Sequence, residues 1–292
     1  MLVELAIGDA YGGAFEYTDP AFVSKNNDLL SYRDHPKWKD QNKAGCYTDD
    51  TQMTIAMAEA LLSDKKLTKK LLADKIVECF KRDPRKSYAR RFGKFLEEIE
   101  TGDEFLEKIS PKSDKSGAAM RASPFGLFSD IKEVLEMSKL QASLTHDTPD
   151  GINSAQAAAL MVHYFAYNLG KKADLPKFIE KHVANDWSSA WTGKIGSKGW
   201  HSVKAAITVI LKSASLSEIL RNCVEFGGDV DTACTIAMAA GSFSKEIKDD
   251  IPMVLVDGLE NDTYGRKFLK KLDEQLLAKF NLGKTDGVWD VL

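Results

Sequence analysis

The feature that most constrains this fold is the start of one helix. Residues 227–232 are Gly-Gly-Asp-Val-Asp-Thr, and a run of small and apolar residues follows from Ala233 to Gly241. The pattern predicts a buried helix with two carboxylates and a hydroxyl on its first turn. Because a helix N-terminus offers only a partial positive charge, we expect a stronger positive charge to neutralise them.

A second stretch far upstream has the same design. Thr48-Asp49-Asp50-Thr51 opens an apolar helix that extends through residues 53–62. Either motif alone would be an ordinary helix cap. If both meet in space, however, each like-charge pair at 4 Å repels by roughly 4 kcal/mol at an effective dielectric of 20. Such a cluster requires protons or bound cations, and an all-oxygen ligand set favours Mg²⁺, Mn²⁺ or Ca²⁺.

Helical periodicity dominates the rest of the chain, and two-residue alternation is almost absent, so we predict an all-α fold with minor β structure. At 292 residues, 43% of them hydrophobic, the chain is at the upper limit of one core, so we expect a single domain over 1–292. Residues 17–47 lack a period and are interpreted as a lid, a binding loop or a solvated insertion. Helices are expected at 1–12, 53–62, 68–82, 90–100, 130–144, 153–168, 175–185, 201–212 and 216–226, and from the 227–232 stretch through 241, with two more between 251 and 282.

Charge and cysteine content narrow the classes of function. The net charge is −3 and the chain has no long basic run, so a nucleic-acid partner is not expected. We expect the protein to act on a small molecule or on the surface of another protein. The four cysteines form no CxxC pair, which favours a reducing compartment. The N-terminus lacks a basic leader, and no apolar run approaches the ~20 residues of a membrane span. We therefore expect a cytoplasmic protein without membrane contact.

Five ordered motifs together resemble the ADP-ribosylglycohydrolase family, and a weaker match lies at Gly258-Leu259-Glu260 with Tyr264. The five are Gly8-Asp9-Ala10 with Glu16, Thr48-Asp49-Asp50-Thr51, Gly117-Ala118-Ala119-Met120-Arg121 with Pro124, Thr145-His146, and Gly228-Asp229-Val230-Asp231-Thr232. The resemblance implies a compact orthogonal bundle of helices. It also implies two Mg²⁺ or Mn²⁺ ions at the base of a cleft that binds ADP-ribose.

The resemblance also implies roles for residues. Metal ligands would be Thr48, Asp49 and Asp50 from one arm, and Asp229, Asp231 and Thr232 from the other. Glu16 and Asp50 would be catalytic. Ser113, Gly117, Ala118, Ala119, Met120 and His146 would contact the ribose and diphosphate. Bound ions of this kind orient the ribose and activate a water, which attacks C1″ through an oxocarbenium-like state.

Several roles stay open at this stage. Glu16 either accepts the proton of the water or hydrogen-bonds a ribose hydroxyl. His146 either contacts the ligand or caps a helix. Asp9 is expected to brace the metal helices, and Arg121 to pair with a buried carboxylate in preference to a phosphate. The family's usual Gly-Asn-Gly is replaced by Lys115-Ser116-Gly117, which leaves the conformation of that loop open.

The expected function is metal-dependent removal of ADP-ribose from a modified protein, most simply from arginine. A non-catalytic ADP-ribose-binding protein of the same fold is the alternative. A terpene-synthase-like enzyme is disfavoured because the metal-binding motif of that class needs carboxylates one helical turn apart on one face, and the sequence here does not have that spacing. Serine, a nucleic-acid end or a free metabolite would present the same ribose, so the acceptor is expected to be chosen by the rim at residues 18–47 and 186–200.

Overall fold

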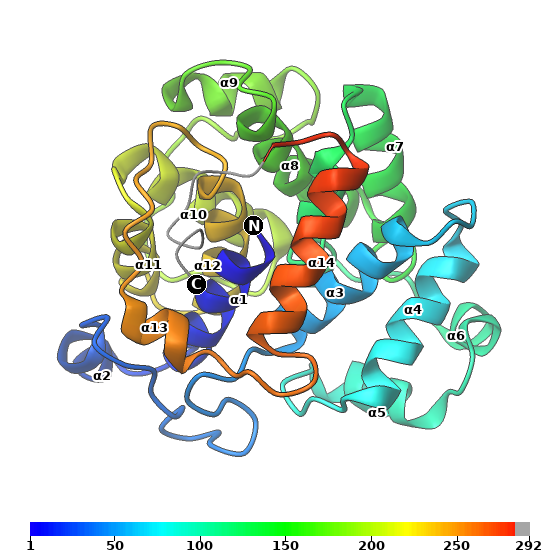
Figure 1. Ribbon diagram of the computed structural model, residues 1–292, viewed down its shortest axis with the longest axis horizontal. Coiled ribbons are helices and arrows are strands. Elements are labelled where there is room, and N and C mark those ends of the chain that lie inside the picture. The colour runs from blue at the N-terminus through cyan, green and yellow to red at the C-terminus, as the bar shows by residue number, and fades with distance from the viewer. Residues whose placement is uncertain (284–292) are drawn as a thin grey trace.

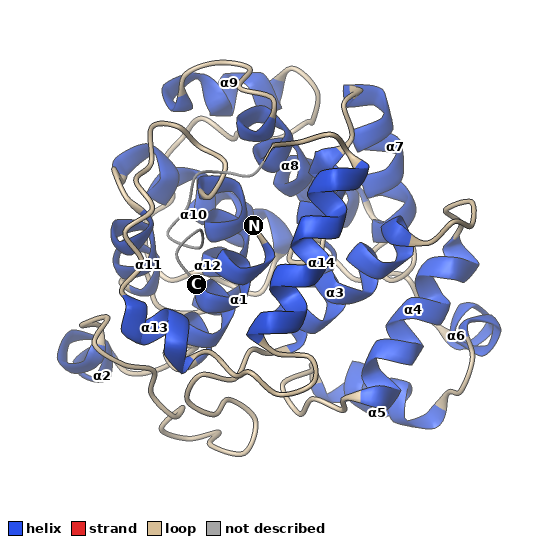
Figure 2. Cartoon of the chain, viewed as in Figure 1, coloured by secondary structure: helices blue, strands red, loops and turns tan. Residues whose placement is uncertain are grey.

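The computed structural model describes residues 1–283, which fold into fourteen α-helices and three short 3₁₀ helices without a β-strand (Figure 2). The expected domain continues to residue 292, and residues 284–292 lie outside the described part. The helices are α1 Leu2–Gly13, α2 Pro20–Asn26, α3 Asp49–Leu62, α4 Lys69–Arg82, α5 Arg90–Glu98, α6 Gly102–Lys108, η1 Ser116–Ala118, η2 Ser123–Leu127, α7 Ile131–Ala142, α8 Pro149–Ala166, η3 Lys172–Asp174, α9 Leu175–Glu180, α10 Gly199–Lys212, α11 Leu216–Val224, α12 Val230–Gly241, α13 Met253–Gly258 and α14 Arg266–Lys279.

The all-α prediction is confirmed, and most predicted helices begin within a few residues of the observed ones. Side-chain caps explain many of these starts, for example at Thr68, Asp130 and Ser215, whose oxygens accept backbone N–H groups of the first turn. The predicted start of α8 was late, because Thr148 caps the helix and Pro149 fits its first position. The predicted helix 175–185 was too long, since α9 ends at Glu180.

Two short helices, α2 and α6, were not predicted. Each has seven residues, which is too short for an apolar stripe to repeat. Their caps are nevertheless present in the sequence, since Asp19 and Thr101 each accept a first-turn N–H. Short helices are thus better detected here from their caps than from their periodicity.

Helices α1 and α12 lie together at the centre of the molecule (Figure 1), and every residue of both is buried. Their backbones approach closely at glycines. A Cβ on Gly8 would lie 2.9 Å from the carbonyl oxygen of Cys234, and one on Gly12 would lie 2.6 Å from Cα of Asp231. The carboxylates at the start of α12 are therefore placed beside the C-terminal end of α1.

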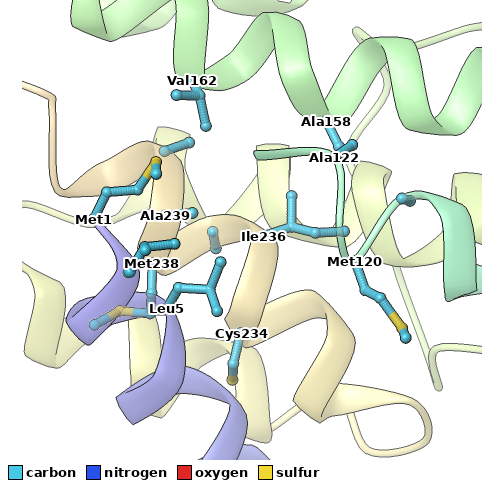
Figure 3. Packing of buried hydrophobic residues seen from close by; sticks show 14 of the residues in the cluster. Met1, Leu5, Met120, Ala122, Ala158, Val162, Cys234, Ile236, Met238 and Ala239 are labelled. Atoms are coloured by element: carbon cyan, nitrogen blue, oxygen red, sulfur yellow. The ribbon is translucent and has the colours of Figure 1, made fainter. Parts of the chain in front are cut away.

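Apolar side chains fill the space around this pair. Figure 3 shows Leu5 of α1 beside Met238 of α12, and Val162 of α8 above them. All three side chains are buried, and burial of each contributes about 2 kcal/mol relative to exposure. The predicted central helix 153–168, observed as α8, packs against α7, α10 and α12. The acidic helix starts are thus anchored in the core.

The polar segment between α2 and α3 is packed against the protein. Its side chains Leu29, Tyr32, His35 and Asn42 are buried. The interpretation of this region as a solvated insertion is therefore wrong for these residues, which contact the last turn of α1 or the turn that follows it. Within residues 1–283 the four cysteines are free thiols, and none of the helices there combines the length and apolarity that crossing a bilayer requires.

Candidate metal centre

Asp9 of α1 fixes the first turn of α3. Its buried carboxylate accepts hydrogen bonds from the backbone N–H of Thr48 and of Thr51, both at 2.9 Å. It also accepts the hydroxyls of the same two residues, at 2.7 and 2.6 Å. Because these four donors occupy its oxygens, Asp9 braces the acidic helix start, in agreement with the structural role expected from the sequence.

A second set of contacts holds the residue that precedes Thr48. Glu260 accepts the backbone N–H of Tyr47 at 2.9 Å and a guanidinium N–H of Arg85 at 2.6 Å. Arg85 also donates to the carbonyl of Tyr47 at 3.0 Å, and the Tyr47 hydroxyl donates to the carbonyl of Tyr264 at 3.1 Å. The weaker motif at 258–264 therefore helps to hold the segment that leads into α3.

The start of α12 depends on two glycines. Gly227 and Gly228 have φ of +65° and +86°, a region that side chains disfavour. A Cβ on Gly228 would lie 1.9 Å from the carbonyl oxygen of Ile195, and that carbonyl accepts the N–H of Asp229 at 3.0 Å. The carbonyl of Gly228 accepts the N–H of Tyr17 at 2.9 Å. This turn therefore brings Asp229 next to the Glu16–Tyr17 turn.

The first turns of α3 and α12 lie together, as the sequence predicted. Carboxylate oxygens of Glu16, Asp229 and Asp231 lie within 4.8 Å of one another. A hydrogen bond from Thr232 joins Asp50 of α3 to the first turn of α12. Glu16 lies on the turn after α1, so three segments far apart in the sequence form one acidic cluster.

The electrostatics of this cluster are unfavourable without a counter-charge. Burial, then the charges of Asp229 and Asp49, raises the pKa of Glu16 to about 8. Burial, then the charge of Asp9, raises the pKa of Asp49 to about 7. Burial also raises the pKa of Asp229, and it raises that of Asp50 and Asp231 well above the usual range. The cluster must therefore hold protons or a cation at neutral pH.

The donor set fits a hard divalent cation. Oδ1 of Asp50 and Oδ1 of Asp231 are buried and have no hydrogen-bond partner among the described residues. Within residues 1–283 no lysine, arginine or histidine forms an ion pair with the clustered carboxylates, although such pairs occur elsewhere, as between Arg85 and Glu260. Unpartnered carboxylate oxygens at this density are ligands that Mg²⁺ and Mn²⁺ prefer. The residues present therefore fit the implied metal.

The predicted substrate loop lies beside this cluster. Ser116 of η1 hydrogen-bonds Asp229, and a Cβ on Gly117 would lie 3.1 Å from Cε1 of His146. The N–H of Ser113 bonds the carbonyl of Thr145 at 3.3 Å, which fixes the start of the loop. The structure thus brings Ser113, Gly117 and His146 together.

The residues after Gly117 are buried. The side chains of Ala118 and Ala119 are fully buried, and Met120 is 5% exposed. The carbonyl of Met120 accepts the hydroxyl of Thr54 in α3 at 3.2 Å. These side chains belong to the hydrophobic core cluster and anchor the loop to it.

Sequence reasoning missed several residues that hold the site. Ser202 of α10 donates to Asp229 at 3.2 Å, and a ring nitrogen of His35 bonds the carbonyl of Glu16 at 2.8 Å. Asn42 hydrogen-bonds both the Glu16 side chain and the carbonyl of Gly13. Ser116 was noted only as a departure from the family pattern. Single polar residues in unpatterned segments give no signal that could have identified the others.

A separate surface groove of about 570 Å³ lies between α3, α4 and α14. Glu59, Leu71 and Phe268 are among its lining residues. None of the clustered carboxylates contributes to it. The acidic cluster and the substrate loop, rather than this groove, therefore define the candidate site.

Comparison with known proteins identifies the family. The family model described as ADP-ribosylglycohydrolase matches residues 1–285. A relative named ADP-ribosylhydrolase ARH3 from Xenopus tropicalis is 24% identical, and the alignment covers 86% of this chain and 87% of that protein. One named ADP-ribosylarginine hydrolase Tri1, from Serratia proteamaculans, is 24% identical, with 82% and 69% covered.

The chain matches a smaller part of another relative. The ARH3 protein of Gallus gallus is 30% identical over 174 residues, which are 54% of this chain and 47% of that protein, so the match spans about half of its length. A solved structure titled "ADP-ribosylglycohydrolase-related protein complex" superposes with a TM-score of 0.66 at 19% identity, and covers 96% of this chain and 95% of that one. At this identity the superposition shows the shared fold.

Proposed function

Because the chain belongs to the ADP-ribosylglycohydrolase family, we propose that it hydrolyses the N- or O-glycosidic bond at C1″ of ADP-ribose and releases ADP-ribose from a modified protein. The observation that supports this most strongly is the meeting of Glu16 with the first turns of two distant helices, where two buried carboxylate oxygens have no hydrogen-bond partner among residues 1–283.

Two Mg²⁺ or Mn²⁺ ions would be held by Thr48, Asp49, Asp50, Asp229, Asp231 and Thr232. When bound, such ions polarise ribose hydroxyls and lower the pKa of a water. The chain's own residues supply the rest of the chemistry. Glu16, whose carboxylate lies within 4.8 Å of those of Asp229 and Asp231, accepts the proton of the water or hydrogen-bonds the ribose. Asp50 is held by a hydrogen bond from Thr232. Together with Glu16 it orients the group that attacks C1″.

The substrate contacts are proposed from the same geometry. The first residues of η1, Gly117 and Ala118, would offer backbone N–H groups to the diphosphate, as helix starts commonly do. His146 lies against Gly117 and is positioned to contact the same part of the ligand. We propose ADP-ribosylated arginine as the substrate, because the relative from Serratia proteamaculans is named for that activity.

A turnover assay tests this function. The double variant Asp229→Asn, Asp231→Asn should lose Mg²⁺ binding and release of ADP-ribose from arginine-linked substrate, while Asp257→Asn, on the exposed surface, should retain both. Serine-linked and nucleic-acid-linked substrates in parallel identify the acceptor. Full turnover by the double variant would refute the proposal. Calorimetric binding of ADP-ribose by wild-type protein without turnover of any substrate would identify the protein as a non-catalytic ADP-ribose binder.

A further inference from the structure

Arg121 is a buried cation with neutral partners. Its side chain is 1% exposed. Its Nε donates to Oε1 of Gln141 at 2.7 Å, and Nη2 donates to the carbonyl of Gln141 at 3.1 Å and to the hydroxyl of Thr145 at 2.8 Å. The expected pairing with a buried carboxylate was therefore wrong. Burying a charge without an opposite charge is costly, so we expect the buried guanidinium of Arg121 to have a functional role.

The hydroxyl of Thr145 transmits the influence of Arg121 to His146. A guanidinium can only donate, so the Thr145 oxygen accepts from Arg121. The same oxygen lies 2.6 Å from Nδ1 of His146. These are its two hydrogen-bond partners among the described residues, so the hydroxyl proton is directed at Nδ1. Nδ1 is then an acceptor, and the ring proton is on Nε2.

Nε2 of His146 is directed toward the substrate loop. A Cβ on Gly117 would lie 3.4 Å from it, and Nε2 has no hydrogen-bond partner among residues 1–283. The backbone N–H of His146 bonds the carbonyl of Ala142 at 2.7 Å, which fixes the ring's attachment. Burial, then the charge of Arg121, lowers the pKa of His146 to about 3. The imidazole is thus neutral and offers one N–H to a ligand beside Gly117.

We propose that Arg121, acting through Thr145, is a positioning residue that holds His146 as the Nε2–H tautomer, so that His146 donates a hydrogen bond to an oxygen of the bound ADP-ribosyl group. The inference rests on the function proposed above. The opposite tautomer would present a lone pair to the oxygens of ribose and phosphate, which would repel it. Arg121 therefore sets the polarity of a contact that it does not itself make.

The tautomer is measured directly from the ¹⁵N chemical shifts of the histidine rings in the full-length protein with Mg²⁺, with His146 assigned by loss of its signals in His146→Gln. We expect Nε2–H in the wild type. Thr145→Val should abolish the preference and weaken ADP-ribose binding about tenfold, as the loss of one good hydrogen bond does. Thr145→Ser should restore both, and Ser138→Ala, which removes another buried hydroxyl, should change neither.

Nδ1–H in the wild-type protein would overturn the proposal, and this result needs no variant to fold. Unchanged tautomer and affinity in folded Thr145→Val would overturn it as well. The shifts are recorded without ADP-ribose, so they are independent of the proposed activity. An Nε2–H ring in a wild-type protein that fails to bind ADP-ribose would overturn the ligand assignment and the proposed function, and would leave the role of Arg121 in setting the tautomer standing.

Discussion

When divalent cations are removed, the free energy of unfolding of the protein should fall as pH rises. The pKa of Glu16 increases from 4.5 to about 8 and that of Asp49 from 3.8 to about 7 in the folded, metal-free protein. At a pH between the lower and the higher pKa of each group, the folded state still binds a proton that the unfolded chain has released. The free energy of unfolding therefore falls with increasing pH over this window, and the low-pH side is the stable one.

The size of the effect follows from the two shifts. Each acid that stays protonated only in the folded state contributes a slope of about 1.4 kcal/mol per pH unit. Glu16 and Asp49 together give about 2.7 kcal/mol per unit between roughly pH 5 and 7, which side-chain relaxation and entering water reduce. If half of this slope remains, Tm falls by about 2 °C per pH unit for a chain of this size.

Differential scanning calorimetry at several pH values, with a chelator or with Mg²⁺, measures this. We expect Tm to fall with pH in chelator and to change much less in Mg²⁺, because the cation replaces the protons. The double variant Asp50→Asn, Asp231→Asn should show a weaker pH dependence and little response to Mg²⁺. A Tm in chelator that is constant or rises between pH 5 and 7, or an absence of stabilisation by Mg²⁺ at neutral pH, would refute the reasoning.

Two core contacts behind the site give further predictions. Asp9→Asn replaces oxygens that accept four donors with an amide that accepts at most two, so unfolding in denaturant should become easier by about 2–4 kcal/mol, and Asp9→Glu should not restore the loss. Gly12→Ala should cost about 2–3 kcal/mol and weaken Mn²⁺ binding in a titration, because the added Cβ pushes α1 from Asp231. The same exchange at Gly93, in α5, should leave Mn²⁺ binding unchanged.

The parts of this structure that could be predicted from sequence are those with a local pattern. Long helices such as α3 and α12 repeat an apolar stripe or a small-residue run, and their acidic starts are contiguous. The meeting of those starts was implied by the family resemblance, since either motif alone would be an ordinary helix cap.

Residues that act singly could not be predicted. Asn42 and His35 come from a polar segment without a period and reach Glu16 only through tertiary packing. The partners of Arg121 depend on the direction of two side chains on separate segments, Gln141 and Thr145. A buried arginine in the sequence indicates that a partner exists and does not indicate whether that partner is charged.

The central claim is that carboxylates from α3, α12 and the Glu16 turn bind divalent cations at one place. Anomalous diffraction from crystals grown with Mn²⁺ tests it most directly. We predict Mn²⁺ peaks between Asp49 and Asp50 on one side and Asp229 and Asp231 on the other, at bonding distance from the oxygens that lack partners. Manganese found only at other surface carboxylates, with this cluster empty at saturating Mn²⁺ and neutral pH, would contradict the account.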